Sequence, residues 1–183
     1  EQPSPQSIGR MMIGALLLAL VTAPLAAAVV CLFTRLARVA EAINLAAAVV
    51  AFACTLPLPF VVGTGQILFW NDYVLIDRAS SWVILCSAIV YLLASIYAVG
   101  YMRLLEVEER LPTFYALFAG FALTVLVGPL MNNVGIYWIV IELTTLVSTF
   151  LVAFEREAES MEAAWKYIMV VSAGISLALL GTL

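Results

Sequence analysis

The sequence contains no histidine, and only 11% of its 183 residues are charged. The lack of histidine excludes a histidine-based metal or haem site within this chain. The cysteines Cys31, Cys54 and Cys86 lie far apart in apolar runs, so no CxxC or other cluster indicates zinc or an iron–sulfur centre. Glycine-rich phosphate loops and nucleophile motifs are also missing. We therefore expect no cofactor, no metal and no nucleic-acid partner for this chain.

Long hydrophobic runs are what the sequence has instead. Hydrophobic residues make up 65% of the chain, whereas roughly half is usual for a soluble domain. The charged residues form short groups between the runs, which predicts an all-α polytopic membrane protein in the lipid bilayer. We expect a polar tail at 1–10 and a single transmembrane domain at 11–183. Its six transmembrane helices are predicted at about 11–33, 39–60, 79–101, 112–131, 134–154 and 160–183.

A segment between the second and third predicted helices has a different pattern. Residues 63–77, GTGQILFWNDYVLID, hold two short β-prone runs around Asn71 and Asp72, which indicates a surface β-hairpin. Asp77 and Ser80 follow it in the positions that would cap the next helix. We expect this hairpin to be external.

The basic residues predict the orientation of the spans. With six spans, one side of the membrane receives Arg35, Arg38, Arg103, Arg110, Arg156 and Lys166. The other side receives only Arg10 and Arg78. Because cytoplasmic loops carry the excess of Lys and Arg, the N-terminus is expected on the external or periplasmic side of the cell inner (plasma) membrane.

Glu142 lies in the middle of the fifth predicted span, with eight apolar-run residues before it and twelve after it. A carboxylate there costs about 2.5–3.5 kcal/mol on insertion scales, so such a residue is usually functional. At 100° per residue, Trp138, Thr145 and Thr149 lie within about 60° of Glu142 on the helix surface. This polar seam predicts a proton-carrying Glu142 on a path lined by the other three residues. The alternative is a protonated Glu142 that only hydrogen-bonds a neighbouring helix.

Lys166 marks the start of the sixth predicted helix and follows Glu162 by four residues, the favourable order for an ion pair. It could relay protons at the cytoplasmic end of the path, with Glu162 lining it. It could equally form a surface pair with Glu162 and extend to the interface. Ser172 and Ser176, further along, could line the same path or pack against a neighbouring helix.

Three segments resemble a known family: VLIDRASSWVILCSAIVYLLASIYAVGYM, NNVGIYWIVIELTTLVSTFLVAF and EAAWKYIMVVSAGISLALLGT. They are similar to the antiporter-like membrane subunits of complex I and of membrane-bound nickel–iron hydrogenases of the formate hydrogenlyase type. The resemblance covers roughly 65–183; residues 11–60 match only as two apolar helices.

The resemblance implies subunits of about fourteen helices, with two inverted five-helix repeats, that move protons through buried Glu and Lys residues linked by water. Glu142 matches the family's fifth-helix glutamate and Lys166 a lysine near the start of the sixth helix. Electrons pass through partner subunits that carry iron–sulfur or nickel–iron centres. The family continues beyond Leu183 into a seventh helix with another functional lysine, so we expect either a fragment or a second polypeptide that completes the path.

We therefore predict the N-terminal portion of a proton-translocating membrane subunit in a complex I-like or hydrogenase redox complex. One alternative is a subunit of a multi-subunit cation/proton antiporter or of an inorganic-carbon uptake complex, without a redox partner. Another is a purely structural membrane anchor.

Overall fold

The computed structural model describes residues 5–63, 65–104, 110–155 and 158–182. Its long helices are α1 (Pro5–Phe33), α2 (Ala37–Thr55), α4 (Arg78–Leu104), α5 (Leu111–Val127), α6 (Val134–Val152) and α7 (Ala158–Thr182). The short elements are α3 (Leu58–Val61), the 3-10 helices η2 (Gly128–Leu130) and η3 (Ala153–Glu155), and the strands β1 (Ile67–Phe69) and β2 (Val74–Ile76). Counting α2 and α3 as one, six helical spans in this part of the chain are long and apolar enough to cross a membrane. The predicted all-α polytopic architecture is confirmed.

Some predicted boundaries differ from those of the structure. Helix α1 begins at Pro5, so residues 5–10 of the predicted tail are helical; proline is well tolerated at the first helical position. The predicted helix 39–60 is divided after Thr55, because Pro57 has no N–H to continue the α2 hydrogen-bond ladder. The other part of the predicted tail, 1–4, and the predicted loop residues 105–109 and 156–157 lie outside the described residues.

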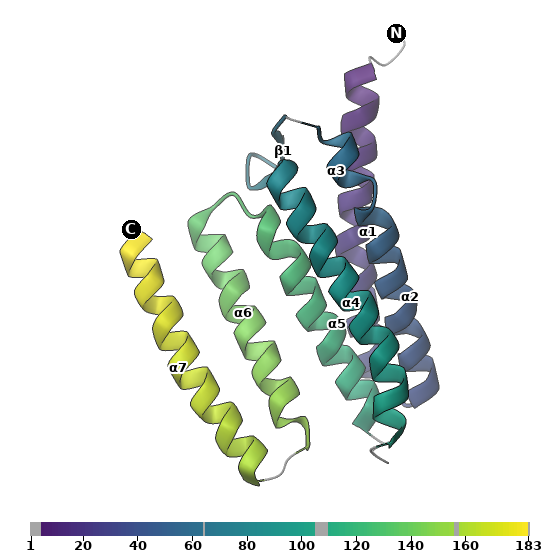
Figure 1. Ribbon diagram of the computed structural model, residues 1–183, viewed down its shortest axis with the longest axis vertical. Helices are drawn as coiled ribbons and strands as arrows, with labels where there is room; N and C mark the ends of the chain where they lie inside the picture. Colours follow the sequence, from purple (N-terminus) through teal and green to yellow (C-terminus); the bar gives the residue numbers. More distant parts are fainter. Residues whose placement is uncertain (1–4, 64, 105–109, 156–157, 183) are drawn as a thin grey trace.

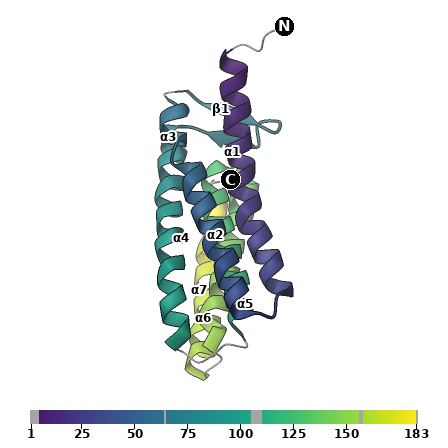
Figure 2. The same cartoon turned by 90° about the vertical axis from the view of Figure 1, so that its right-hand side faces the viewer.

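The helices form an inner group and an outer pair (Figures 1 and 2). In the inner group, α1 packs on α2 and α5, and α2 also packs on α4 and α5. Helix α6 lies against α5, and α7 lies against α6 at the edge of the molecule. Within the most apolar stretch of α5, 50% of the residues are buried, against 6% for α6 and for α7. Few residues of the outer pair are therefore fully buried by the described part of the chain.

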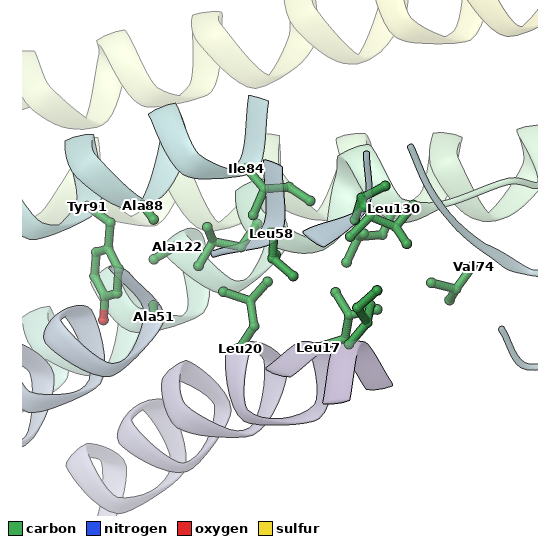
Figure 3. Packing of buried hydrophobic residues seen from close by; sticks show 14 of the residues in the cluster. Leu17, Leu20, Ala51, Leu58, Val74, Ile84, Ala88, Tyr91, Ala122 and Leu130 are labelled. Atoms are coloured by element: carbon green, nitrogen blue, oxygen red, sulfur yellow. The ribbon is translucent and has the colours of Figure 1, made fainter. Parts of the chain in front are cut away.

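The main apolar core joins the inner helices at their hairpin end (Figure 3). It includes Leu17 and Leu20 of α1, Ala51 of α2, Ile84 of α4 and Ala122 of α5. Alanine recurs where the helices meet, as Ala40, Ala47, Ala48 and Ala51 on α2 and as Ala116, Ala119 and Ala122 on α5. Small residues let helix backbones approach closely, which is the main source of helix association inside a bilayer.

The predicted β-hairpin is present, with Phe69 paired to Val74 at its turn. Trp70, Asn71 and Asp72 all have positive φ, which Asn and Asp tolerate far better than Trp. Two hydrogen bonds fix the hairpin to the α5–α6 connection. The Asn132 backbone N–H donates to the Tyr73 backbone carbonyl (2.9 Å), and the Asn132 side-chain amide donates to the Asp72 backbone carbonyl (2.9 Å). The hairpin, which was predicted to be external, and the α5–α6 connection therefore lie together at one end of the bundle.

The predicted cap of α4 is also present. The Ser80 backbone N–H donates to Asp77 Oδ1 (2.7 Å), and the Asp77 N–H donates to the Ser80 hydroxyl (2.9 Å). This reciprocal pair satisfies donors that a helix start leaves free. The hydrogen bonds from Ser80 hold the pKa of Asp77 below its usual range. The hairpin thus passes into α4 through a defined turn.

A buried polar cluster connects α2 and α4. The Tyr91 hydroxyl donates to Asn44 Oδ1 (2.9 Å), and Asn44 Nδ2 donates to Ser95 Oγ (3.1 Å). Asn44 and Ser95 are fully buried. Because no water reaches a group at this depth, an unpaired polar group would be costly. The hydrogen bonds among Asn44, Tyr91 and Ser95 avoid that cost.

We expect Ser95→Ala to lower the free energy of unfolding by about 1 kcal/mol, since it leaves the Asn44 amide without its acceptor. Ser87→Ala on the same helix is the matched control: the Ser87 hydroxyl is exposed and bonds the Val83 carbonyl of its own helix (2.9 Å). Its effect should stay within about 0.5 kcal/mol. Denaturant unfolding in detergent micelles measures both values, and equal losses for the two variants would contradict a stabilising role of the cluster.

Candidate functional site

Helix α6, which carries Glu142, has a well-defined start. Its N-cap is Asn133, whose side-chain oxygen accepts from the backbone N–H groups of Gly135 (3.0 Å) and Ile136 (3.2 Å). Two of the amide donors that a helix start leaves free are thereby satisfied. The cap sets where α6 begins and so the depth at which Glu142 lies.

Glu142 lies mid-way along α6, half-buried, on the side that faces α7. The Ser172 hydroxyl of α7 donates to Glu142 Oε1 at 2.6 Å. In the described part of the chain, Glu142 forms no ion pair. The site is therefore a carboxyl group held across two helices by a neutral hydroxyl donor.

Two buried polar atoms remain beside this contact. Glu142 Oε2 and the indole Nε1 of Trp138 have no hydrogen-bond partner among the described residues. Trp138 precedes Glu142 by four residues and therefore lies on the same face of α6. The Trp138 indole Nε1 can only donate a hydrogen bond, and Glu142 Oε2 accepts one when the carboxyl is ionised.

The two threonines of the predicted seam lie on α6 as expected, and Thr145 is buried. Their hydroxyls donate within the helix: Thr145 to the Ile141 carbonyl (3.2 Å) and Thr149 to the Thr145 carbonyl (2.7 Å). These bonds occupy the hydroxyl protons, so each oxygen can act toward a water or proton only as an acceptor.

Lys166 and Glu162 form the expected i, i+4 ion pair, and it is exposed, with 66% and 62% of their side-chain surface accessible. The structure does not bring Lys166 to Glu142. Lys166 precedes Ser172 by six residues, about 9 Å along the α7 axis toward the predicted cytoplasmic end. A second contact between α6 and α7 joins the hydroxyls of Ser148 and Tyr167 (3.2 Å).

Sequence reasoning did not identify the Asn44 cluster or decide between Ser172 and Ser176. Asn44 could have been found, because an amide in an alanine-rich span also needs a hydrogen-bond partner on another helix. The structure separates the two serines: Ser172 binds Glu142, whereas Ser176 is exposed. Among the described residues, no group of three or more His, Cys, Asp or Glu side chains could hold a metal ion.

We expect Asn133→Ala to cost about 1 kcal/mol of unfolding free energy, because α6 loses the acceptor for two backbone amides. Asn133→Asp keeps an acceptor oxygen at the same place and should stay close to wild type. Thermal unfolding in detergent compares the two variants. A similar loss for both would mean that the cap does not stabilise α6.

Comparison with curated proteins finds a segment of 51 residues, 28% of this chain, that is 47% identical to the Hydrogenase-4 component F homolog of Methylacidiphilum infernorum (isolate V4). The matched segment spans only 11% of the length of that relative. No protein-family model matches the chain. The local identity supports the resemblance of this chain to the antiporter-like membrane subunits of hydrogenase and complex I-like complexes.

Proposed function

We propose that this chain forms part of a proton-translocating membrane subunit in a complex I-like or membrane-bound hydrogenase complex of the cell inner membrane. Iron–sulfur or nickel–iron partner subunits would carry out the redox chemistry, and this chain would move protons. The name of the related hydrogenase component supports the type of complex. The polar site between α6 and α7 supports the proton-moving role.

The observation that carries the proposal is the Glu142 carboxyl, mid-way along α6 and bound to Ser172 of α7. An ionised carboxylate without a cationic partner is costly in hydrocarbon, whereas its neutral form is much cheaper to bury. A carboxyl in such a place can take up a proton and release it when a positive charge or water approaches. A group meant only to join helices would be served as well by an amide, at lower cost.

The ion pair of Glu162 and Lys166 has a separate place in this proposal. It is exposed at the predicted cytoplasmic end of α7, where protons would enter or leave. Since Lys166 has no direct contact with Glu142, its role would be to pass protons to the water-accessible end of the path. The uncovered surfaces of α6 and α7 would pack against further membrane subunits or segments that complete this path.

Glu142→Gln tests the proposal, because glutamine keeps the shape and the acceptor oxygen but cannot carry the proton. We expect redox-driven proton pumping by the complex in reconstituted vesicles to fall by about tenfold or more. Subunit content on a native gel should not change. A pH-sensitive dye inside the vesicles measures the pumping rate.

Glu159→Gln makes the same chemical change at an exposed residue in the first turn of α7 and should pump like the wild type. Lys166→Met should have an intermediate effect, since water can replace a relay at the membrane surface. Normal pumping by Glu142→Gln would sink the proposal, and normal pumping by Lys166→Met as well would leave a structural anchor.

The orientation is part of the same proposal and has its own test. Asp72 lies at the tip of the hairpin, and Leu36, with 66% of its surface exposed, lies between α1 and α2 at the opposite end. In a variant whose three native cysteines are replaced by serine, we expect Asp72→Cys to react with a membrane-impermeant maleimide in intact cells. Leu36→Cys should react only after the cells are opened. The reverse pattern would contradict an external N-terminus.

A further inference from the structure

The two oxygens of the Glu142 carboxyl have different surroundings. Oε1 accepts from Ser172 at 2.6 Å, whereas Oε2 is buried and has no partner among the described residues. A hydroxyl that donates to one oxygen stabilises the tautomer in which that oxygen is the carbonyl. Ser172 therefore directs an incoming proton to Oε2.

The surroundings of Oε2 indicate what binds there. Trp138 lies one turn N-terminal to Glu142 on the same face of α6, and side chains of a helix lean toward its N-terminus. The indole N–H of Trp138 is buried, and nothing in the described part of the chain accepts its hydrogen bond. Buried donors and acceptors that do not reach each other are commonly joined by a water molecule.

We infer that Ser172 and Trp138 are the positioning residues of Glu142. Ser172 fixes Oε1, and Trp138 Nε1–H and Glu142 Oε2 together bind a water molecule that exchanges the proton. This inference rests on the proposed function and names the atom that is protonated.

A single water molecule satisfies both states of the site. When Glu142 is ionised, the water donates to Oε2 and accepts from the indole N–H. When a hydrated proton arrives, one O–H bond of H₃O⁺ breaks and an O–H bond forms on Oε2, which leaves a neutral water. The Oε2–H group then donates to that water, which still accepts from Trp138. The Ser172 hydroxyl donates to Oε1 throughout.

The described charged side chains of the neighbouring helices form no contact with the Glu142 carboxyl. Helix α5 and η2, which also pack on α6, carry no charged side chain in Leu111–Leu130. The titratable side chains of α7 are Glu159, Glu162, Lys166 and Tyr167, all nearer than Ser172 to its cytoplasmic end; Lys166 pairs with Glu162 and Tyr167 bonds Ser148. Ser172 is thus the described hydrogen-bond donor to Glu142 from a neighbouring helix.

Infrared difference spectra of the reconstituted complex, recorded on a step in pH, test the inference. The carbonyl band of protonated Glu142 is the one that Glu142→Gln removes. We expect Ser172→Ala to shift this band to higher frequency, because the carbonyl loses a hydrogen bond, and Ser172→Thr to keep it in place. Ser176→Ala, one turn further along α7, is the matched control and should leave the band unchanged.

The water site has a separate readout in the same spectra. A water O–H band that shifts in water of the heavy oxygen isotope should disappear in Trp138→Phe, which keeps the ring and removes the N–H. An unchanged carbonyl band in Ser172→Ala, or an unchanged water band in Trp138→Phe, would overturn the inference even if Glu142→Gln abolishes pumping. Normal pumping by Glu142→Gln would instead refute the proposed function itself.

Discussion

The hydrocarbon core of a bilayer offers no water, so every polar group within the spans must find its partner inside the protein. The helices satisfy the backbone, and most hydroxyls follow the same rule locally: Ser87, Thr144 and Thr149 each bond a carbonyl of their own helix. Side chains that cannot be satisfied locally must reach another helix. Asn44 and Glu142 are such residues, and the contacts they make connect α2 to α4 and α6 to α7.

These two contacts differ in what they allow. The amide of Asn44 is fully buried between Tyr91 and Ser95, and all three groups keep one protonation state at ordinary pH. Such a cluster stabilises one arrangement of α2 and α4. The Glu142 site combines a group that can change its charge with an oxygen that has no described partner, at the thinly covered pair of α6 and α7. The inner group is therefore suited to hold the structure, whereas the outer pair carries the site of the proposed proton transfer.

The spans, the hairpin and the Asp77–Ser80 cap were predictable, because hydropathy, turn residues and capping residues act over a few neighbouring positions. The Glu162–Lys166 pair was predictable for the same reason. The hydrogen-bond partner of Glu142 was not predictable from the sequence. The rotation of α7 relative to α6 decides between Ser172 and Ser176, and the periodicity of a single helix does not reveal that rotation. The division of α2 from α3, by contrast, follows from Pro57, which is a local signal in the sequence.

The separation of Lys166 from Glu142 limits how the proposed proton release from Glu142 could occur. A charge about 9 Å away along the axis, already paired with Glu162 and exposed, offers little stabilisation to an ionised Glu142, because solvent weakens its field. Proton release needs a stronger stabilising group close to Oε2. Neither α5 nor α7 contributes a described cation at that level, so such a group would come from outside these two helices. Ser172 leaves Oε2 as the oxygen that such a group and its water would meet.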